Sequence, residues 1–121
     1  MISTWEVDLG HIEHWLLELD QGSYEHVIAA VELLSTYGPQ LGRPLMDSVS
    51  GSAHKNMKEL RPGSSGRSEL RVLFAFDSHR TAILLVAGDK AGRWKKWYQE
   101  NIPVADVRFE NHENTLRGER R

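Results

Sequence analysis

The sequence predicts an α+β domain in which two N-terminal helices pack on a small antiparallel β-sheet, a meander, with a C-terminal helix or helices. Apolar residues recur every three or four positions before residue 38 and every second position after residue 54, which indicates helices followed by strands. The length of 121 residues suffices for one core and not for two. Residues 1–121 are therefore expected to form a single domain, with a frayed tail over 113–121.

The first predicted elements are a short extended segment and a helix. Residues 3–8 alternate apolar and polar side chains, as a strand or the lead-in to a helix would. From Leu9 to Leu19 the apolar residues form one stripe, and Gly22 is expected to end this helix.

A second, antiparallel helix follows after a short loop. Ser23 is a suitable N-cap, and Gly38 with Pro39 closes the helix. Residues 39–54 are rich in Pro, Gly and Ser, which indicates a connector rather than a regular element. Its apolar residues are expected to pack beneath it: Leu41, Leu45 and Val49.

The meander is predicted from strands at 55–61, 68–77 and 81–87. In the second strand Leu70, Val72, Phe74 and Phe76 face one way, opposite to Glu69, Arg71, Leu73 and Ala75. The third strand is continuously apolar, which is typical of a strand buried on both faces.

The C-terminal region predicts one helix after residue 92 and a further helix that starts at Pro103 and runs to about residue 116. Trp94, Trp97 and Tyr98 share one face of the first of these helices. The two tryptophans are expected to belong to the core, with base stacking as the alternative, whereas the polar tip of Tyr98 suits it to meet a substrate.

The charge of the chain is unevenly distributed. The net formal charge is −2, yet residues 1–42 hold seven Asp or Glu and no Lys or Arg, whereas residues 43–121 hold fifteen basic and ten acidic residues. This asymmetry predicts a polyanion site confined to one part of the molecule. The absence of cysteine excludes disulfides, thiolate zinc sites and a cysteine nucleophile. No signal-peptide pattern and no run of roughly 18 apolar residues is present, so we expect a cytoplasmic protein without a membrane partner.

Arg71 is the most informative basic residue, because an arginine between apolar residues in mid-strand needs an ionic partner or a ligand. Its partner could be Glu59 or Glu69. His54, next to the basic strand, is either a general acid or base or an inert loop histidine. The pair His11 and His14 is too poor in ligands to predict a metal, so no metal and no cofactor are expected.

Four segments together resemble the RelE/ParE superfamily of toxins, and most closely its HigB or phage Gp49-like branch. They are Leu33–Leu45 with its "LGRP" connector, Met57–Arg61 with "ELR", Leu70–Phe74, and Ile83–Lys90, a strand that ends in a lysine-bearing loop. The resemblance covers residues 2–110 and implies a RelE-like fold.

The resemblance implies metal-independent cleavage of mRNA in the ribosomal A site, in which the 2′-hydroxyl attacks the adjacent phosphorus. Arg71 falls on the arginine that contacts the scissile phosphate, Lys90 falls near the second cation, and Tyr98 or Trp97 near the C-terminal aromatic. Lys58 or His54 could assist proton transfer, although strand alternation turns Lys58 away from the usual face. Equally, Glu59 and Arg61 could form a structural pair on the other face. The remaining expected RNA contacts are Arg61, Arg67 and Arg93.

The implied partners are a cognate helix-turn-helix antitoxin, the ribosome and mRNA, with operator DNA bound only through the antitoxin. The sequence leaves two alternative functions open. A ParE-like toxin would poison DNA gyrase by binding alone, and an inactive toxin-like scaffold would bind only its antitoxin.

Overall fold

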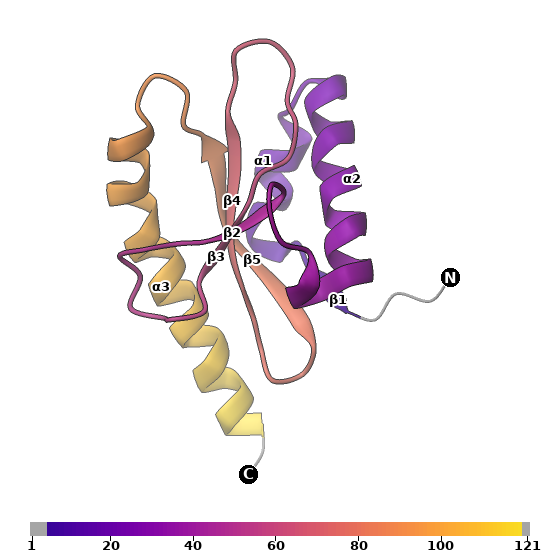
Figure 1. Cartoon of the computed structure of the whole chain (residues 1–121). Helices are drawn as coiled ribbons and strands as arrows, with labels where there is room; N and C mark the ends of the chain where they lie inside the picture. The colour runs from indigo at the N-terminus through magenta and orange to yellow at the C-terminus, as the bar shows by residue number, and fades with distance from the viewer. Residues whose placement is uncertain (1–4, 120–121) are drawn as a thin grey trace.

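The computed structural model describes residues 5–119, in which a five-stranded sheet separates two helical layers (Figure 1). The strand order is β1-β5-β4-β3-β2, and all neighbours are antiparallel except β1 and β5, which are parallel. The strands are β1 (Glu6–Asp8), β2 (Met46–Ser48), β3 (Lys58–Leu60), β4 (Leu70–Phe76) and β5 (Thr81–Asp89). The helices are α1 (Glu13–Leu17), α2 (Gln21–Tyr37) and α3 (Trp94–Glu119), with single 3₁₀ turns at Gly10–Ile12 and Gly38–Gln40. The predicted α+β class is therefore confirmed.

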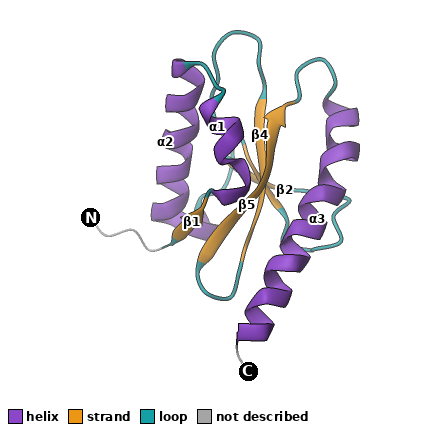
Figure 2. Cartoon of the chain, turned by 180° about the vertical axis from the view of Figure 1, so that it is seen from behind, coloured by secondary structure: helices purple, strands orange, loops and turns teal. Residues whose placement is uncertain are grey.

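The sheet is buried on both faces, which gives the domain two apolar clusters. One lies between the sheet and α1–α2 and includes Leu70, Val72 and Phe74, while Leu73 and Ala75 belong to the other cluster beneath α3. The alternation predicted for β4 is thus confirmed. Figure 2 shows α1 and α2 on one side of the strands and α3 on the other. Any side chain of β3 to β5 therefore lies on either the α2 side or the α3 side.

The first helical layer differs from the sequence-based prediction at its turn. Gly22 does not end a helix but lies in the first turn of α2, because the N-cap is Asp20. The Asp20 carboxylate accepts a hydrogen bond from the Ser23 amide at 3.0 Å, which satisfies an otherwise free donor at the start of the helix. Ser23 is instead buried, and its hydroxyl accepts a hydrogen bond from the Ser65 amide at 3.2 Å.

Two short strands extend the predicted meander at its edges. The N-terminal extended segment forms β1 and pairs with β5, with Val7 opposite Ala82. The connector contains β2, which pairs with β3 and brings Asp47 opposite Glu59. Its Leu41 and Leu45 pack on the α2-side cluster and its Val49 on the α3-side cluster, as expected.

A single helix replaces the two predicted C-terminal helices. α3 runs unbroken from Trp94 to Glu119 with Pro103 inside it, so the proline does not start a new helix. Its apolar face, with Ile102, Ala105 and Phe109, is buried against the sheet, and this packing offsets the helix-breaking effect of proline. The segment 113–119, expected to be frayed, is helical, and residues 120–121 of that tail lie outside the described range. Within residues 5–119 no helix is long and apolar enough to span a membrane.

Candidate active site

The structure brings Arg71, Lys90 and Tyr98 together on the α3 side of the sheet. Arg71 of β4 lies opposite Gly88 of β5, and the Lys90 amide donates to the Glu69 carbonyl at 3.0 Å just beyond the ends of these strands. The Lys90 ammonium is 5.6 Å from the ring centre of Tyr98, which the first turns of α3 supply. We call these three residues the cationic cluster.

Arg71 is held without an ionic partner. Its Nη1 atom donates to the Leu70 carbonyl at 2.8 Å, and its Nε atom is buried without a hydrogen-bond acceptor. Among the described residues neither Glu59 nor Glu69, the two carboxylates considered for it, forms a salt bridge with it. A buried, unsatisfied donor on a charged group is costly, so the Nε atom of Arg71 disfavours folding in the free protein.

Lys90 is mostly enclosed, with 14% of its side chain exposed. The Glu69 carboxylate lies 3.9 Å from its ammonium, and the ring centre of Trp94 lies 5.5 Å away. The aromatic faces of Trp94 and Tyr98 favour a cation at this point. Two cations from adjacent strands therefore meet beside one phenol.

Tyr98 is half-buried, and its hydroxyl donates a hydrogen bond of 2.5 Å to Glu59 Oε1. Burial, followed by the hydrogen bond and the negative charge of Glu59, raises the pKa of Tyr98 to about 12. The nearby Arg71 guanidinium acts in the opposite direction and does not outweigh these effects. Tyr98 therefore carries its proton at neutral pH.

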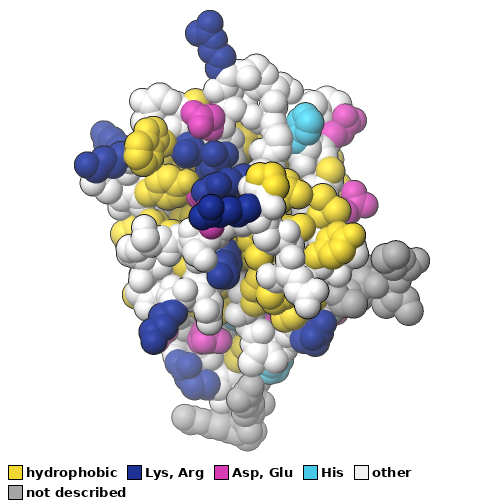
Figure 3. Space-filling model, in the orientation of Figure 1, with side chains coloured by type: hydrophobic (Ala, Val, Ile, Leu, Met, Phe, Trp, Pro, Cys, Tyr) yellow, Lys and Arg dark blue, Asp and Glu magenta, His cyan; other side chains and the backbone are white. Residues whose placement is uncertain are grey.

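A chain of ion pairs continues from Glu59 along the edge of the sheet. Glu59 Oε2 accepts hydrogen bonds of 2.7 Å from Arg61 Nε and Nη2. Arg61 also reaches Asp47 of β2 at 3.2 Å, and Asp47 is 3.2 Å from Arg43. Figure 3 shows the resulting group of Lys and Arg side chains over the middle of the molecule, flanked by hydrophobic surface.

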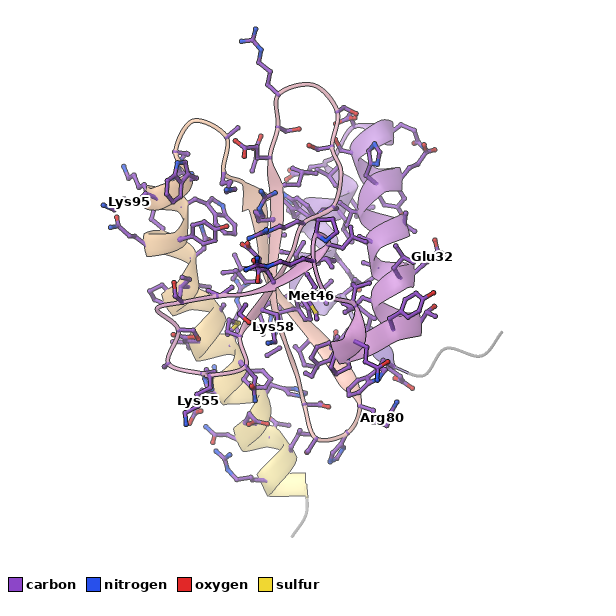
Figure 4. All side chains as sticks on the ribbon, in the orientation of Figure 1. Glu32, Met46, Lys55, Lys58, Arg80 and Lys95 are labelled. Atoms are coloured by element: carbon purple, nitrogen blue, oxygen red, sulfur yellow. The ribbon has the colours of Figure 1, made fainter. Side chains whose placement is uncertain are left out.

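A cleft of about 570 Å³ opens beside the cationic cluster, between α3 and the loop after β2. Tyr98 and Glu59 belong to its wall, and Trp94, 59% exposed, stands at its rim. Lys95, labelled in Figure 4, lies on the outer side of α3 and also lines the cleft. The cleft thus combines apolar side chains with Lys95, and Tyr98 connects it to the cationic cluster; this arrangement suits a ligand that carries both a ring and a phosphate.

The two residues considered for proton transfer lie elsewhere. Lys58 is on the α2 side of β3, opposite in direction to Glu59, and its ammonium donates to Ser48 Oγ at 3.3 Å. His54 packs edge-on against Phe109 at 5.1 Å, and its Nε2 atom is 3.3 Å from the Asp106 carbonyl. Within residues 5–119, neither side chain forms a hydrogen bond or an ion pair with Arg71, Lys90 or Tyr98.

The residues expected to contact RNA are dispersed. Arg61 belongs to the ion-pair chain, Arg67 is exposed on the loop between β3 and β4, and Arg93 pairs with Glu100. Trp97 is only 3% exposed beneath Gly88, which confirms its expected core position and rules out the alternative of base stacking, so its expected RNA contact is wrong. The core position expected for Trp94 is also wrong, because this residue faces solvent.

Glu59 has a hydrogen bond to Tyr98 that was not predicted from the sequence, which offered Glu59 only as a partner for Arg71 or, correctly, for Arg61. Alternation along β3 places it on the same face as the fully buried Met57. A glutamate on a core face requires hydrogen-bond partners, and this signal could have identified it. Residues 5–119 contain no group of His, Asp and Glu arranged to hold a metal ion.

Most of the chain is similar to known proteins. Residues 14–110 match the family described as "Phage derived protein Gp49-like (DUF891)". "Putative toxin HigB2" of Mycobacterium tuberculosis is 59% identical over 108 residues, which cover 89% of this chain and 54% of that protein. "Putative toxin HigB3" of the same organism is 50% identical over 103 residues, which cover 85% of this chain and 88% of that protein. The chain therefore spans about half the length of the first relative and most of the second.

Proposed function

The chain belongs to the Gp49-like family, in which its relatives bear HigB toxin names, and we propose that it is the toxin of a type II toxin–antitoxin pair that cleaves mRNA on the ribosome. One observation supports this activity above the others. Arg71, whose Nε atom is buried without a hydrogen-bond partner, and Lys90 both lie next to Tyr98, and Tyr98 in turn lines the cleft. Two cations and a protonated phenol are the groups that phosphodiester cleavage requires.

The proposed reaction forms a bond between the 2′-oxygen and phosphorus and breaks the bond from phosphorus to the 5′-oxygen. The Arg71 fork suits two phosphate oxygens at once, and Lys90 adds a point charge, so both stabilise the developing negative charge. Tyr98 is the proton-carrying group in contact with these cations. Lys58 and His54, held on other surfaces, would have to act from outside the cationic cluster.

The proposed partners follow from the toxin assignment. A cognate helix-turn-helix antitoxin would neutralise the protein and connect it to operator DNA, while the ribosome would present the mRNA. The two halves of opposite charge support this division, because RNA is attracted to the basic residues after position 42.

Expression in a bacterial host tests the proposal. The wild-type protein should arrest growth and produce mRNA cuts that are visible by primer extension. Arg71→Ala should relieve the arrest and reduce cutting at least about 100-fold, because a charge-stabilising donor is lost. Arg117→Ala, an exposed arginine near the end of α3, is the control and should remain toxic.

Three outcomes would contradict the proposed cleavage. Persistent toxicity of Arg71→Ala would remove the assigned site. Inhibition of purified gyrase at a low molar ratio, without mRNA cuts, would identify a binding poison. Normal growth at high expression without an antitoxin would identify an inactive scaffold.

A further inference from the structure

We propose that Glu59 is the positioning residue of the site, which fixes the Tyr98 hydroxyl in the orientation that cleavage requires and receives its proton. The inference rests on the proposed function for its chemistry, but its structural part concerns only Glu59, Tyr98 and their neighbours.

Both oxygens of the Glu59 carboxylate have dedicated partners. Oε1 accepts the Tyr98 hydroxyl hydrogen at 2.5 Å, and Oε2 accepts both Arg61 hydrogen bonds at 2.7 Å. The residue is only 3% exposed. A carboxylate in this position is desolvated, so its charge acts on Tyr98 and Arg61 far more strongly than a surface charge would.

The partners of Glu59 come from separate elements. Arg61 follows β3 and is fixed in turn by Asp47 of β2, while Tyr98 comes from α3. The carboxylate therefore joins the sheet edge to the helix that carries the phenol. A lone hydroxyl on a helix could rotate among several acceptors, whereas a hydroxyl that donates to a doubly anchored carboxylate has one preferred direction.

This direction determines what the Tyr98 oxygen can do. Because its hydrogen is directed at Glu59 and the Arg71 guanidinium donates to one of its two lone pairs, the other lone pair is available to accept a proton. In the proposed step the 2′-hydroxyl proton passes to the Tyr98 oxygen as the Tyr98 proton passes to Glu59. The bond from the 2′-oxygen to phosphorus forms, the bond to the 5′-oxygen breaks, and the Lys90 ammonium protonates the departing oxygen. Solvent then removes the proton from Glu59 and returns a proton to Lys90, which resets both groups.

Glu59→Gln tests the inference, because glutamine keeps the size of the side chain and removes its charge. The first readout is the titration of Tyr98, followed by NMR on protein with ¹³C-labelled tyrosine and assigned by loss of the signal in Tyr98→Phe. The transition should move to lower pH, since the negative charge of Glu59 raises the pKa of Tyr98. Glu25→Gln, an exposed glutamate on α2, is the matched control and should leave the Tyr98 titration unchanged.

The second readout is RNA cleavage by the same proteins. Glu59→Gln should lower kcat at least about ten-fold with little change in KM, as expected for a group that acts on proton transfer rather than binding. In a Tyr98→Phe background the same substitution should cause no further loss, because the hydroxyl that it positions is absent. A purely structural glutamate would instead lower activity in both backgrounds.

The outcomes separate this inference from the proposed function. An unchanged Tyr98 titration in Glu59→Gln, or equal losses of kcat in the two backgrounds, would overturn the positioning role. If the wild-type protein cleaves no RNA, the proposed function fails, while the titration still decides whether Glu59 controls Tyr98. If Glu59→Gln does not fold, Glu59→Asp takes its place, because aspartate keeps the negative charge but holds it one methylene farther from Tyr98. It too should lower kcat.

Discussion

Arg71 illustrates how a single residue can be retained at a cost to stability. Its Nε atom is buried without an acceptor, its Nη1 atom donates to the carbonyl of its neighbour Leu70, and its side chain also hydrogen-bonds to the Tyr98 hydroxyl. Removing a charged group from water without an ion-pair partner disfavours folding. The proposed contact with a phosphate would offset this cost.

Because the Nε atom of Arg71 is buried without an acceptor, we expect Arg71→Met to stabilise the protein. Methionine fills a similar volume with apolar atoms and leaves no donor unsatisfied, so the free energy of unfolding should rise by about 1 kcal/mol. Urea denaturation measures the change, with Arg67→Met on the exposed loop as a control expected within about 0.5 kcal/mol of wild type. A fall in stability for Arg71→Met would mean that the arginine has a structural partner after all.

At the scale of elements, the turn between β4 and β5 is joined to α3 by one buried carboxylate. Asp77, whose side chain is 2% exposed, accepts a hydrogen bond of 2.7 Å from His112 of α3. Its other oxygen accepts the amides of His79 and Thr81 within the turn. Burial opposes ionisation, but these hydrogen bonds outweigh it and lower the pKa of Asp77 below its usual 3.8.

The lowered pKa predicts acid sensitivity with a defined sign. Since the folded pKa of Asp77 is below the unfolded value, its contribution to stability is present above about pH 4 and is lost as the pH falls through the folded pKa. Asp77→Asn should lower the free energy of unfolding at pH 7 by about 1–3 kcal/mol, and the difference should shrink below pH 4. Urea denaturation across this pH range measures the difference in the free energy of unfolding, with Glu32→Gln, an exposed residue of α2, as the control. A difference that does not depend on pH would contradict the assignment.

The elements differ in how far the sequence predicts them, for physical reasons. α2, β4 and β5 carry long apolar patterns and were predicted. β2 has only three residues, so alternation cannot identify it, and it exists because β3 offers a free edge. Pro103 remains inside α3 because tertiary packing outweighs local propensity.

The candidate site, too, was predicted from the sequence only in part. Arg71, Lys90 and Tyr98 were named from the sequence, and the structure brings them together. Both Trp94 and Trp97 were predicted to be buried, which is right for Trp97 and wrong for Trp94, because both lie on one helix and only the contact of Gly88 with Trp97 decides which ring is buried. The role of Glu59 depends on the pairing of β3 with its neighbours and on the approach of α3, and neither is encoded locally.

At the scale of the whole molecule, the acidic N-terminal layer and the cationic cluster lie on opposite faces of the sheet. The acidic residues before position 43 belong mainly to the α1–α2 layer, while the cationic cluster lies on the α3 side. Screening at physiological ionic strength limits the reach of a charge to about 8 Å. The local positive region can therefore bind a polyanion although the protein as a whole carries a formal charge of −2.

The salt dependence of RNA binding tests this separation. For single-stranded RNA the logarithm of the binding constant should fall with the logarithm of salt concentration by about 0.7 per phosphate neutralised. Arg71→Ala and Lys90→Ala should each make this slope about 0.7 shallower, because each removes one phosphate contact. Glu25→Lys on α2 changes the net charge by two in the opposite sense but lies on the far layer, so it should leave the slope unchanged. Fluorescence anisotropy with a labelled oligonucleotide measures all four proteins. If Glu25→Lys steepens the slope as much as Arg71→Ala reduces it, RNA responds to total charge, and the cationic cluster is not its binding site.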